Sequence, residues 1–243
     1  MKRSFWYSIA LSMALVSNNA VGNDKPKIHF ITPEIPNLSL MDKGLYHDLL
    51  DEVYGDEYDV EIKNMPYKRA MALIQRSRFY SGILGVVDRS SNLLMPKNPG
   101  LNFEYLGVAT YKNRQVNTIR DIYKSRVAWQ SKYDFFDNET ALALFSFIPT
   151  KSIENGIDLL LNDRIDFLID DYRSLKNEQL RNGSTTLKIH KLNPGSKVFI
   201  GFKPSVESER LIKVFDDRMT SLRANNSLDK IYSKWNETVP FNE

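Results

Sequence analysis

Cysteine is absent from this chain of 243 residues. Its absence excludes a disulfide framework, a thiolate zinc site, a cysteine nucleophile and a lipid-modified N-terminal cysteine. A dense tract of lysine and arginine is also missing. In addition, the 33 basic residues are nearly balanced by 30 acidic ones, and the formal net charge is only +3. Phosphate binding needs basic side chains gathered on one face, so we expect no nucleic-acid partner.

The common signatures of catalytic and cofactor sites are missing as well. The three histidines, His29, His47 and His190, stand in unrelated settings. The sequence contains no HExxH zinc motif, no Gly-x-Ser-x-Gly nucleophile elbow and no glycine-rich loop that could cradle a phosphate. We therefore expect no metal, no cofactor and no enzyme activity.

The sequence also lacks an apolar run that is long enough to span a bilayer. The longest apolar stretch runs from Phe5 to Val16, shorter than the ~20 residues that a membrane span requires. Lys2 and Arg3 precede this stretch, and the small residues Ala20-Val21-Gly22 follow it. This order predicts a signal peptide over residues 1–22 that is cleaved on export, with a membrane anchor as the alternative. We expect the mature protein to be soluble in the periplasm.

The remaining chain has the composition of a globular protein, with 42% hydrophobic and 26% charged residues. Its length allows one large domain or two lobes. From residue 27 to residue 87, segments with strand and helix periodicity alternate in the order β-α-β-α-β. The expected strands are 27–32, 58–62 and 83–87, and the expected helices are 46–54 and a segment from Pro66. This order predicts a parallel sheet covered by helices.

A second α/β unit follows. We expect strands at 105–110, 126–129, 165–169 and 198–202. The expected helices are 138–147, ending at Pro149, and then 153–161, 208–222 and 227–235. Two α/β lobes with more than one crossing between them follow from this pattern.

Several short motifs occur in a defined order along the mature chain. They are Glu34-Ile35-Pro36-Asn37, Asp42-Lys43-Gly44 with Asp48, Pro66-Tyr67-Lys68-Arg69-Ala70, Arg89, 127–130 followed by 132–135, 160–166, and 225–235. Over about residues 27 to 236 the chain resembles the periplasmic solute-binding proteins of the amino-acid-binding class (family 3). The resemblance implies a two-lobed α/β fold of the periplasmic-binding-protein type II, with parallel-type sheets, flanking helices and an interlobe cleft. We expect lobe 1 to comprise residues 23–108 and 196–243, and lobe 2 residues 109–195.

The chain departs from the family pattern at several loops. Lys132 stands where family members usually have glycine in the second-lobe loop. Asp163 stands where they usually have glycine at the end of the helix expected at 153–161. Pro36-Asn37 replaces Pro-Pro. Glycine lets backbone N–H groups approach a ligand closely, so the ligand of this chain is expected to be held differently from a standard α-carboxylate.

The resemblance places five candidate binding residues in the cleft. Arg89 would bind a carboxylate and Asp171 an ammonium group, with Asp170 as a rival. Glu34 would bind a cationic group, and Tyr67 and Tyr133 would stack on the ligand. The structural alternatives are an Arg89–Asp88 pair in solvent, a helix N-cap at Asp171, a loop-ordering role for Glu34, and core packing for the tyrosines.

The resemblance implies a binding protein for a small polar solute, an amino acid or a related amine, that delivers it to an ABC-type transporter. The acidic candidates Glu34, Asp170 and Asp171 outnumber the basic one, so if all of them face the cleft we expect a ligand with more than one positive charge, such as a basic amino acid or a polyamine. The first alternative is a ligand-sensing adaptor for a membrane signalling receptor. The second is an enzyme on the same fold, because paired carboxylates in a cleft can carry acid–base chemistry. The expected partners are the small ligand and a membrane permease or sensor, and the protein is expected to be a monomer.

Overall fold

The computed structural model describes residues 25–87, 92–97, 100–111, 114–131, 138–183 and 186–240. The expected signal peptide, Arg89, Lys132 and Tyr133 lie outside these residues. Within the described part of the chain, no helix is long and apolar enough to cross a membrane.

The first sheet has five strands in the order β2-β1-β3-β10-β4. Strand β1 pairs in parallel with both β2 and β3, which confirms the predicted parallel arrangement. Strand β10 runs antiparallel to β3 and β4, so the complete sheet is mixed. The bounds are Lys27–Thr32 for β1, Asp59–Asn64 for β2, Gly82–Val86 for β3, Asn102–Glu104 for β4 and Ser196–Phe202 for β10.

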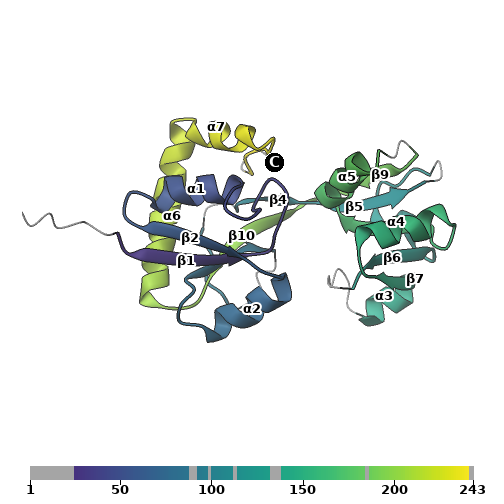
Figure 1. Cartoon of the computed structure of the whole chain (residues 1–243), viewed down its shortest axis with the longest axis horizontal. Helices are drawn as coiled ribbons and strands as arrows, with labels where there is room; N and C mark the ends of the chain where they lie inside the picture. The colour runs from purple at the N-terminus through teal and green to yellow at the C-terminus, as the bar shows by residue number, and fades with distance from the viewer. Residues whose placement is uncertain are drawn as a thin grey trace, which may run out of the picture.

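Helices cover both faces of this sheet (Figure 1). Phe30 of β1 packs into the core under α1, α6 and α7, whereas its neighbour Ile31 packs into the core under α2. This alternation is the period of two that a strand buried on both faces requires. The helices are Leu45–Tyr54 (α1), Tyr67–Arg76 (α2), Val206–Ala224 (α6) and Ser227–Lys234 (α7).

The second sheet has the strand order β7-β6-β8-β5-β9. Strand β6 is parallel to β7 and β8, and β5 is antiparallel to β8 and β9. The strands are Leu106–Thr110 (β5), Arg126–Gln130 (β6), Ser146–Thr150 (β7), Phe167–Asp171 (β8) and Lys188–Lys191 (β9). The helices are Asn138–Leu144 (α3), Ile153–Leu161 (α4) and Tyr172–Arg181 (α5), with a 3-10 turn at Ile119–Ile122.

The predicted helix at 138–147 is wrong at its C-terminal end. Helix α3 stops at Leu144, and the next residues form strand β7, which contains Pro149. A proline cannot donate to a ladder, but β7 lies at the end of the described sheet and pairs with β6 alone, so the missing donor is tolerated. The predictions also omitted α5 and β9, and β8 extends to Asp171 rather than ending at Ile169.

Helix α4 ends in a Schellman motif. The Arg164 N–H donates to the Leu159 carbonyl at 2.9 Å, and the Asp163 N–H donates to the Leu160 carbonyl at 3.2 Å. Asp163 occupies the left-handed position of this motif, with φ 56°. The left-handed backbone conformation explains why family members usually have glycine at this position. Asp163 adopts the same conformation with backbone strain, because it has a Cβ.

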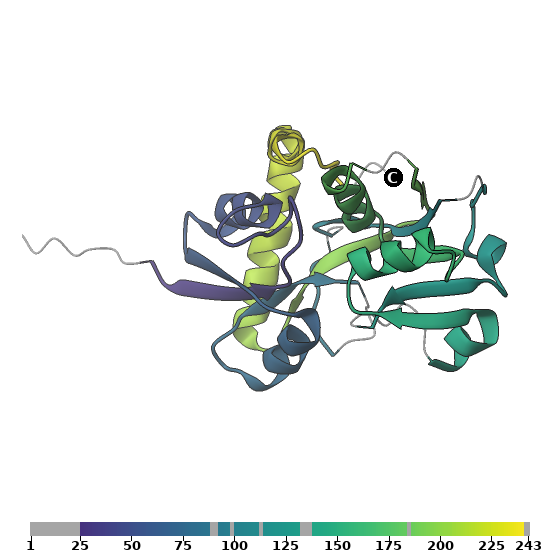
Figure 2. The same cartoon turned by 45° about the vertical axis from the view of Figure 1, so that its right-hand side comes forward.

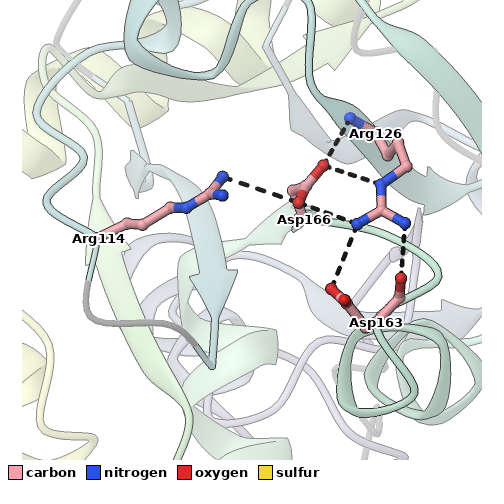
Figure 3. A network of polar contacts seen from close by, with 4 residues as sticks. All are labelled: Arg114, Arg126, Asp163 and Asp166. Carbon is pink, nitrogen blue, oxygen red and sulfur yellow. Dashed lines mark hydrogen bonds and ion pairs between the residues drawn. The ribbon is translucent and has the colours of Figure 1, made fainter.

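Arg126 connects the end of α4 to the start of β8 (Figure 3). Its Nε and Nη2 donate to Asp166 Oδ2 and Oδ1 at 3.0 and 3.1 Å, and its Nη1 donates to the Asp163 carbonyl at 2.6 Å. Arg114 lies 3.8 Å from Asp166 Oδ1 on the other side. The hydrogen bond from Arg126 lowers the pKa of the Asp166 carboxyl below its ordinary value. All four residues belong to the second sheet and its loops, so this network is internal to one lobe.

The two sheets form separate bodies in Figure 1, with separate hydrophobic cores. The chain passes from β4 to β5 at Tyr105 and returns between β9 and β10. Lys191 Nζ lies 3.3 Å from the centre of the Tyr105 ring, which holds the two crossings together. We propose lobe boundaries at Tyr105 and between Lys191 and Ser196, because a division after residue 108 would cut strand β5.

Candidate functional site

The carboxyl ends of the parallel strands in the two lobes face each other. Strand β3 runs toward the crossing because it is antiparallel to β10, whose first residue, Ser196, lies at the crossing. Strand β8 also runs toward the crossing, because Asp171 at its end pairs with Leu106 at the start of β5. Figure 1 shows β1 pointing at the second lobe. Such facing carboxyl edges are where α/β sheets place ligand groups.

In lobe 1, a loop from Pro33 to Gly44 follows β1 and is crossed by several hydrogen bonds. The buried Ser39 N–H donates to the Ile35 carbonyl at 2.8 Å, and Asn64 Nδ2 at the end of β2 donates to Ser39 Oγ at 3.1 Å. Glu34 lies at the start of this loop and is exposed. Its carboxylate is therefore accessible at the edge of lobe 1, while the loop is ordered by its neighbours.

Tyr67 is the first residue of α2 and packs, half-buried, against the core between α2 and the sheet. Its place at the helix start puts it on the same side of lobe 1 as the end of β1. Arg89 follows β3 along the chain and lies outside the described residues, as does Tyr133. The structure thus places Glu34 and Tyr67 on lobe 1 and Asp171 on the opposing edge of lobe 2.

The edge of lobe 2 carries a buried carboxylate. Asp170 is fully buried, its Oδ2 accepts from Gln130 Nε2 at 2.7 Å, and its Oδ1 accepts from the Asp171 N–H at 2.9 Å. Gln130 ends strand β6, next to β8 in the sheet. The first bond ties Asp170 to the end of β6, and the second ties its side chain to the backbone of Asp171.

Asp171 is the N-cap of α5. Its Oδ1 accepts from the Ser174 N–H at 2.8 Å, which is the structural role considered as the alternative to ligand binding. A carboxylate has two oxygens with several acceptor positions, so capping is compatible with a second donor. The side chain is 8% exposed and lies at the crossing end of β8.

Two further charged residues surround Asp171 and were not among the predicted site residues. Glu104 of β4 lies close enough to Asp171, Asp170 and Arg173 to interact with them electrostatically, and Arg173 lies in the first turn of α5. Burial, followed by repulsion from Asp171, raises the pKa of the Glu104 carboxyl to about 7. The sequence analysis missed Glu104 and Arg173 because neither residue belongs to a recognised motif. The two residues come together only through the pairing of strands.

The described residues contain no group of three or more histidine, aspartate or glutamate side chains that could hold a metal ion. Among the described residues, the facing edges carry carboxylates, an amide, an arginine and an aromatic ring. Such an arrangement can accept hydrogen bonds from a cationic group and contact an apolar one.

No family model matches the sequence, and no curated protein matches it. Solved structures do match the fold. One is a histidine kinase sensor domain with similarity to periplasmic binding proteins, with a TM-score of 0.71, 12% identity and coverage of 88% of this chain and 97% of that one. Another is a substrate-binding protein of an ABC uptake transporter from Streptococcus pneumoniae with bound histidine, with a TM-score of 0.68, 16% identity and coverage of 89% and 95%.

A third similar structure is an ancestral arginine-binding protein bound to arginine, with a TM-score of 0.67, 16% identity and coverage of 88% and 99%. At these identities the likeness shows the fold. The predicted two-lobed α/β fold, and the resemblance in architecture to amino-acid-binding proteins, are confirmed.

Proposed function

We propose that this protein binds a small polar solute, an amino acid or a related amine, between its lobes and delivers it to an ABC-type transporter. The observation that carries the proposal is Asp171, which ends β8 at the crossing and interacts electrostatically with Glu104 at the edge of lobe 1. Similar folds that bind arginine and histidine support this assignment.

Each lobe supplies part of the proposed site. Asp171 of lobe 2 binds the ammonium group of the ligand, and Arg89 of lobe 1 binds its carboxylate, if it has one. Glu34 contacts a second cationic group, and Tyr67 and Tyr133 provide aromatic walls. No catalytic step is assigned to any of these residues.

The charge at the facing edges favours a cationic ligand. Among the described residues at these edges, Glu34, Asp170, Asp171 and Glu104 are acidic, and Arg173, a cation near them, is already paired with Glu237. A ligand with more than one positive charge, such as a basic amino acid or a polyamine, would offset this excess of carboxylates.

A thermal-shift screen of residues 23–243 tests the proposal with arginine, lysine, histidine, putrescine, spermidine, glutamate and succinate as probes. A ligand that binds only the folded state stabilises it by about 2.7 kcal/mol at one hundred times its dissociation constant. We expect a concentration-dependent shift with the cationic probes. A shift with glutamate or succinate alone would contradict the charge argument, and turnover of any probe would show an enzyme instead.

The variant Asp171→Ser separates ligand binding from helix capping. Serine retains a capping oxygen, so the free energy of unfolding is expected to stay within ~0.5 kcal/mol of the wild type. The shift produced by the cationic probe is expected to disappear, because serine carries no charge. The matched control is Ser152→Asp at the N-cap of α4, which exchanges the same two residue types in lobe 2 and should leave the probe response unchanged.

The second candidate is a ligand-sensing adaptor for a membrane receptor, favoured by the likeness to a histidine kinase sensor domain. Affinity purification from detergent-solubilised membranes distinguishes the two. Recovery of a permease supports transport, and recovery of a sensor kinase without a permease supports the adaptor.

Export to the periplasm and a monomeric state also belong to this proposal. A cleaved chain in the periplasmic fraction, with a mass that corresponds to residues 23–243, is the expected result. Light scattering of that fraction is expected to give one copy per particle. Retention of the full chain in the membrane fraction would favour an N-terminal anchor.

A further inference from the structure

An ion pair between side chains joins the two lobes beside one of the chain crossings. Arg173 Nε donates to Glu237 Oε1 at 2.8 Å, and Arg173 Nη2 donates to Glu237 Oε2 at 2.7 Å. The two side chains are 18% and 13% exposed. Although burial opposes the charged form, attraction to Glu237 holds the pKa of Arg173 above its ordinary value. Two parallel, charge-assisted hydrogen bonds in a partly buried site form the strongest type of side-chain pair.

Glu237 is fixed to lobe 1. Its N–H donates to the carbonyl of Tyr232 at 3.1 Å, and the fully buried Tyr232 donates from its hydroxyl to the Leu101 carbonyl at 2.5 Å. Val239, two residues further on, packs into the core of lobe 1. The segment after α7 is therefore part of the body of lobe 1.

Arg173 is fixed to lobe 2. It lies in the first turn of α5, which Asp171 caps, and the preceding residue, Tyr172, donates from its N–H to the Tyr105 carbonyl at 2.9 Å. Figure 2 shows the C-terminal segment running from α7 toward this end of α5. The ion pair thus connects two rigid bodies whose backbones are joined at the crossing.

The hydrophobic cores do not oppose a relative rotation of the lobes. The four hydrophobic clusters each belong to one lobe, so rotation about the crossings disrupts no cluster. It would separate Arg173 from Glu237, however. Two charges with little exposure would then lose their partner, which is costly.

We propose that the Arg173–Glu237 pair is an interlobe latch that stabilises the present arrangement of the lobes relative to arrangements in which they have rotated. The latch sets the population of this arrangement in the absence of ligand. Any ligand that prefers one arrangement therefore binds with an apparent affinity that depends on the pair.

The absence of native cysteine allows a direct test. The changes Gln75→Cys in α2 and Leu142→Cys in α3 place one exposed thiol on each lobe, and both can carry nitroxide spin labels. Double electron–electron resonance spectroscopy then gives the distribution of distances between the two labels in protein without ligand. Glu237→Gln is expected to move or broaden this distribution, because the neutral amide removes the charge attraction.

The matched control is Asp166→Asn, which neutralises a bidentate arginine pair whose carboxylate is about as buried as Glu237 and whose partners both lie in lobe 2 (Figure 3). It is expected to leave the distance distribution unchanged. The exchanged pair Arg173→Glu with Glu237→Arg is expected to restore the wild-type distribution, at least in part.

An unchanged distribution in Glu237→Gln overturns the latch, and so does an equal change in Asp166→Asn. If Glu237→Gln does not fold, Arg173→Lys replaces it, since lysine keeps the charge but loses one of the two bonds. A partial shift supports the latch, and the wild-type distribution overturns it. Because no ligand is present, the result is independent of whether the proposed solute binding is correct.

Discussion

The carboxyl edges of the two lobes are built by different means. In lobe 1 the loop from Pro33 to Gly44 is shaped by backbone hydrogen bonds and by the backbone conformation of Gly44. The φ of Gly44 is 136°, a value that essentially only glycine adopts. In lobe 2 the edge is shaped by buried polar side chains, Gln130, Asp170 and Asp171. Lobe 1 should therefore be sensitive to changes in backbone freedom, and lobe 2 to changes in charge and pH.

The largest effect is expected for Gly44→Ala in lobe 1. A Cβ at this position would lie 2.3 Å from the Leu38 carbonyl oxygen, and the backbone conformation is itself strained for alanine. Together these effects should lower the free energy of unfolding by about 3 kcal/mol or more, measured by urea denaturation.

The matched control for Gly44→Ala is Gly183→Ala, with a φ of 59° and no atom within 4 Å of the added Cβ. It lacks the clash and should cost only about 1 kcal/mol. Equal losses in the two variants would show that the loop of lobe 1 adjusts and is not fixed by its backbone.

Asp170→Ala tests the polar construction of lobe 2. It leaves the Gln130 amide and the Asp171 N–H without their acceptor, and should lower the free energy of unfolding by roughly 2–3 kcal/mol. Adding Gln130→Leu removes one orphaned group, so the double variant should be less destabilised than the sum of the single ones. Strict additivity in urea denaturation would mean that the two side chains do not act together.

The pH dependence of stability should depend on Glu104. Its pKa is about 7 in the folded protein against an ordinary value of 4.5, so the folded state holds a proton that the unfolded state has released. The stability contributed by this group is complete below pH 4.5 and is lost as the pH rises to about 7, by no more than about 3 kcal/mol. Asp170, Asp171 and Arg173 are the charged groups that act on its pKa electrostatically.

Urea denaturation at pH 5 and pH 7.5 measures this effect as a difference between the wild type and Glu104→Gln. The variant is expected to lose less stability between the two pH values, because glutamine does not titrate. Parallel losses in both proteins would remove Glu104 as the source of the pH dependence.

The smallest effect is expected for Asp163→Gly at the end of α4. Glycine relieves the left-handed conformation but loses the exposed contact with Arg126, so the net gain should be only ~0.5 kcal/mol. Thermal denaturation measures the change. A clear loss of stability would mean that the Asp163 side chain contributes more than its backbone strain costs.

Local pattern determined much of the fold. Strand β1 was predicted with its observed bounds, and α1, α4 and α6 within a few residues, because their apolar residues recur with the period of the element that they form. Pro149 misled the prediction, since its place in an edge strand depends on which strand lies beside it. Glu34, Tyr67, Arg89, Tyr133 and Asp171 remain predictions as ligand contacts.

By itself, the sequence determined the alternation of strands and helices, the two α/β units and the acidic residues that follow β8, because these depend on neighbours within a few positions. Only the tertiary structure decided that Asp170 bonds to Gln130, that Glu104 lies within electrostatic reach of Asp171, and that Arg173 pairs with Glu237 sixty-four positions away. Contacts between distant segments depend on strand order and on where the chain crosses between lobes. Neither of these is encoded in local periodicity.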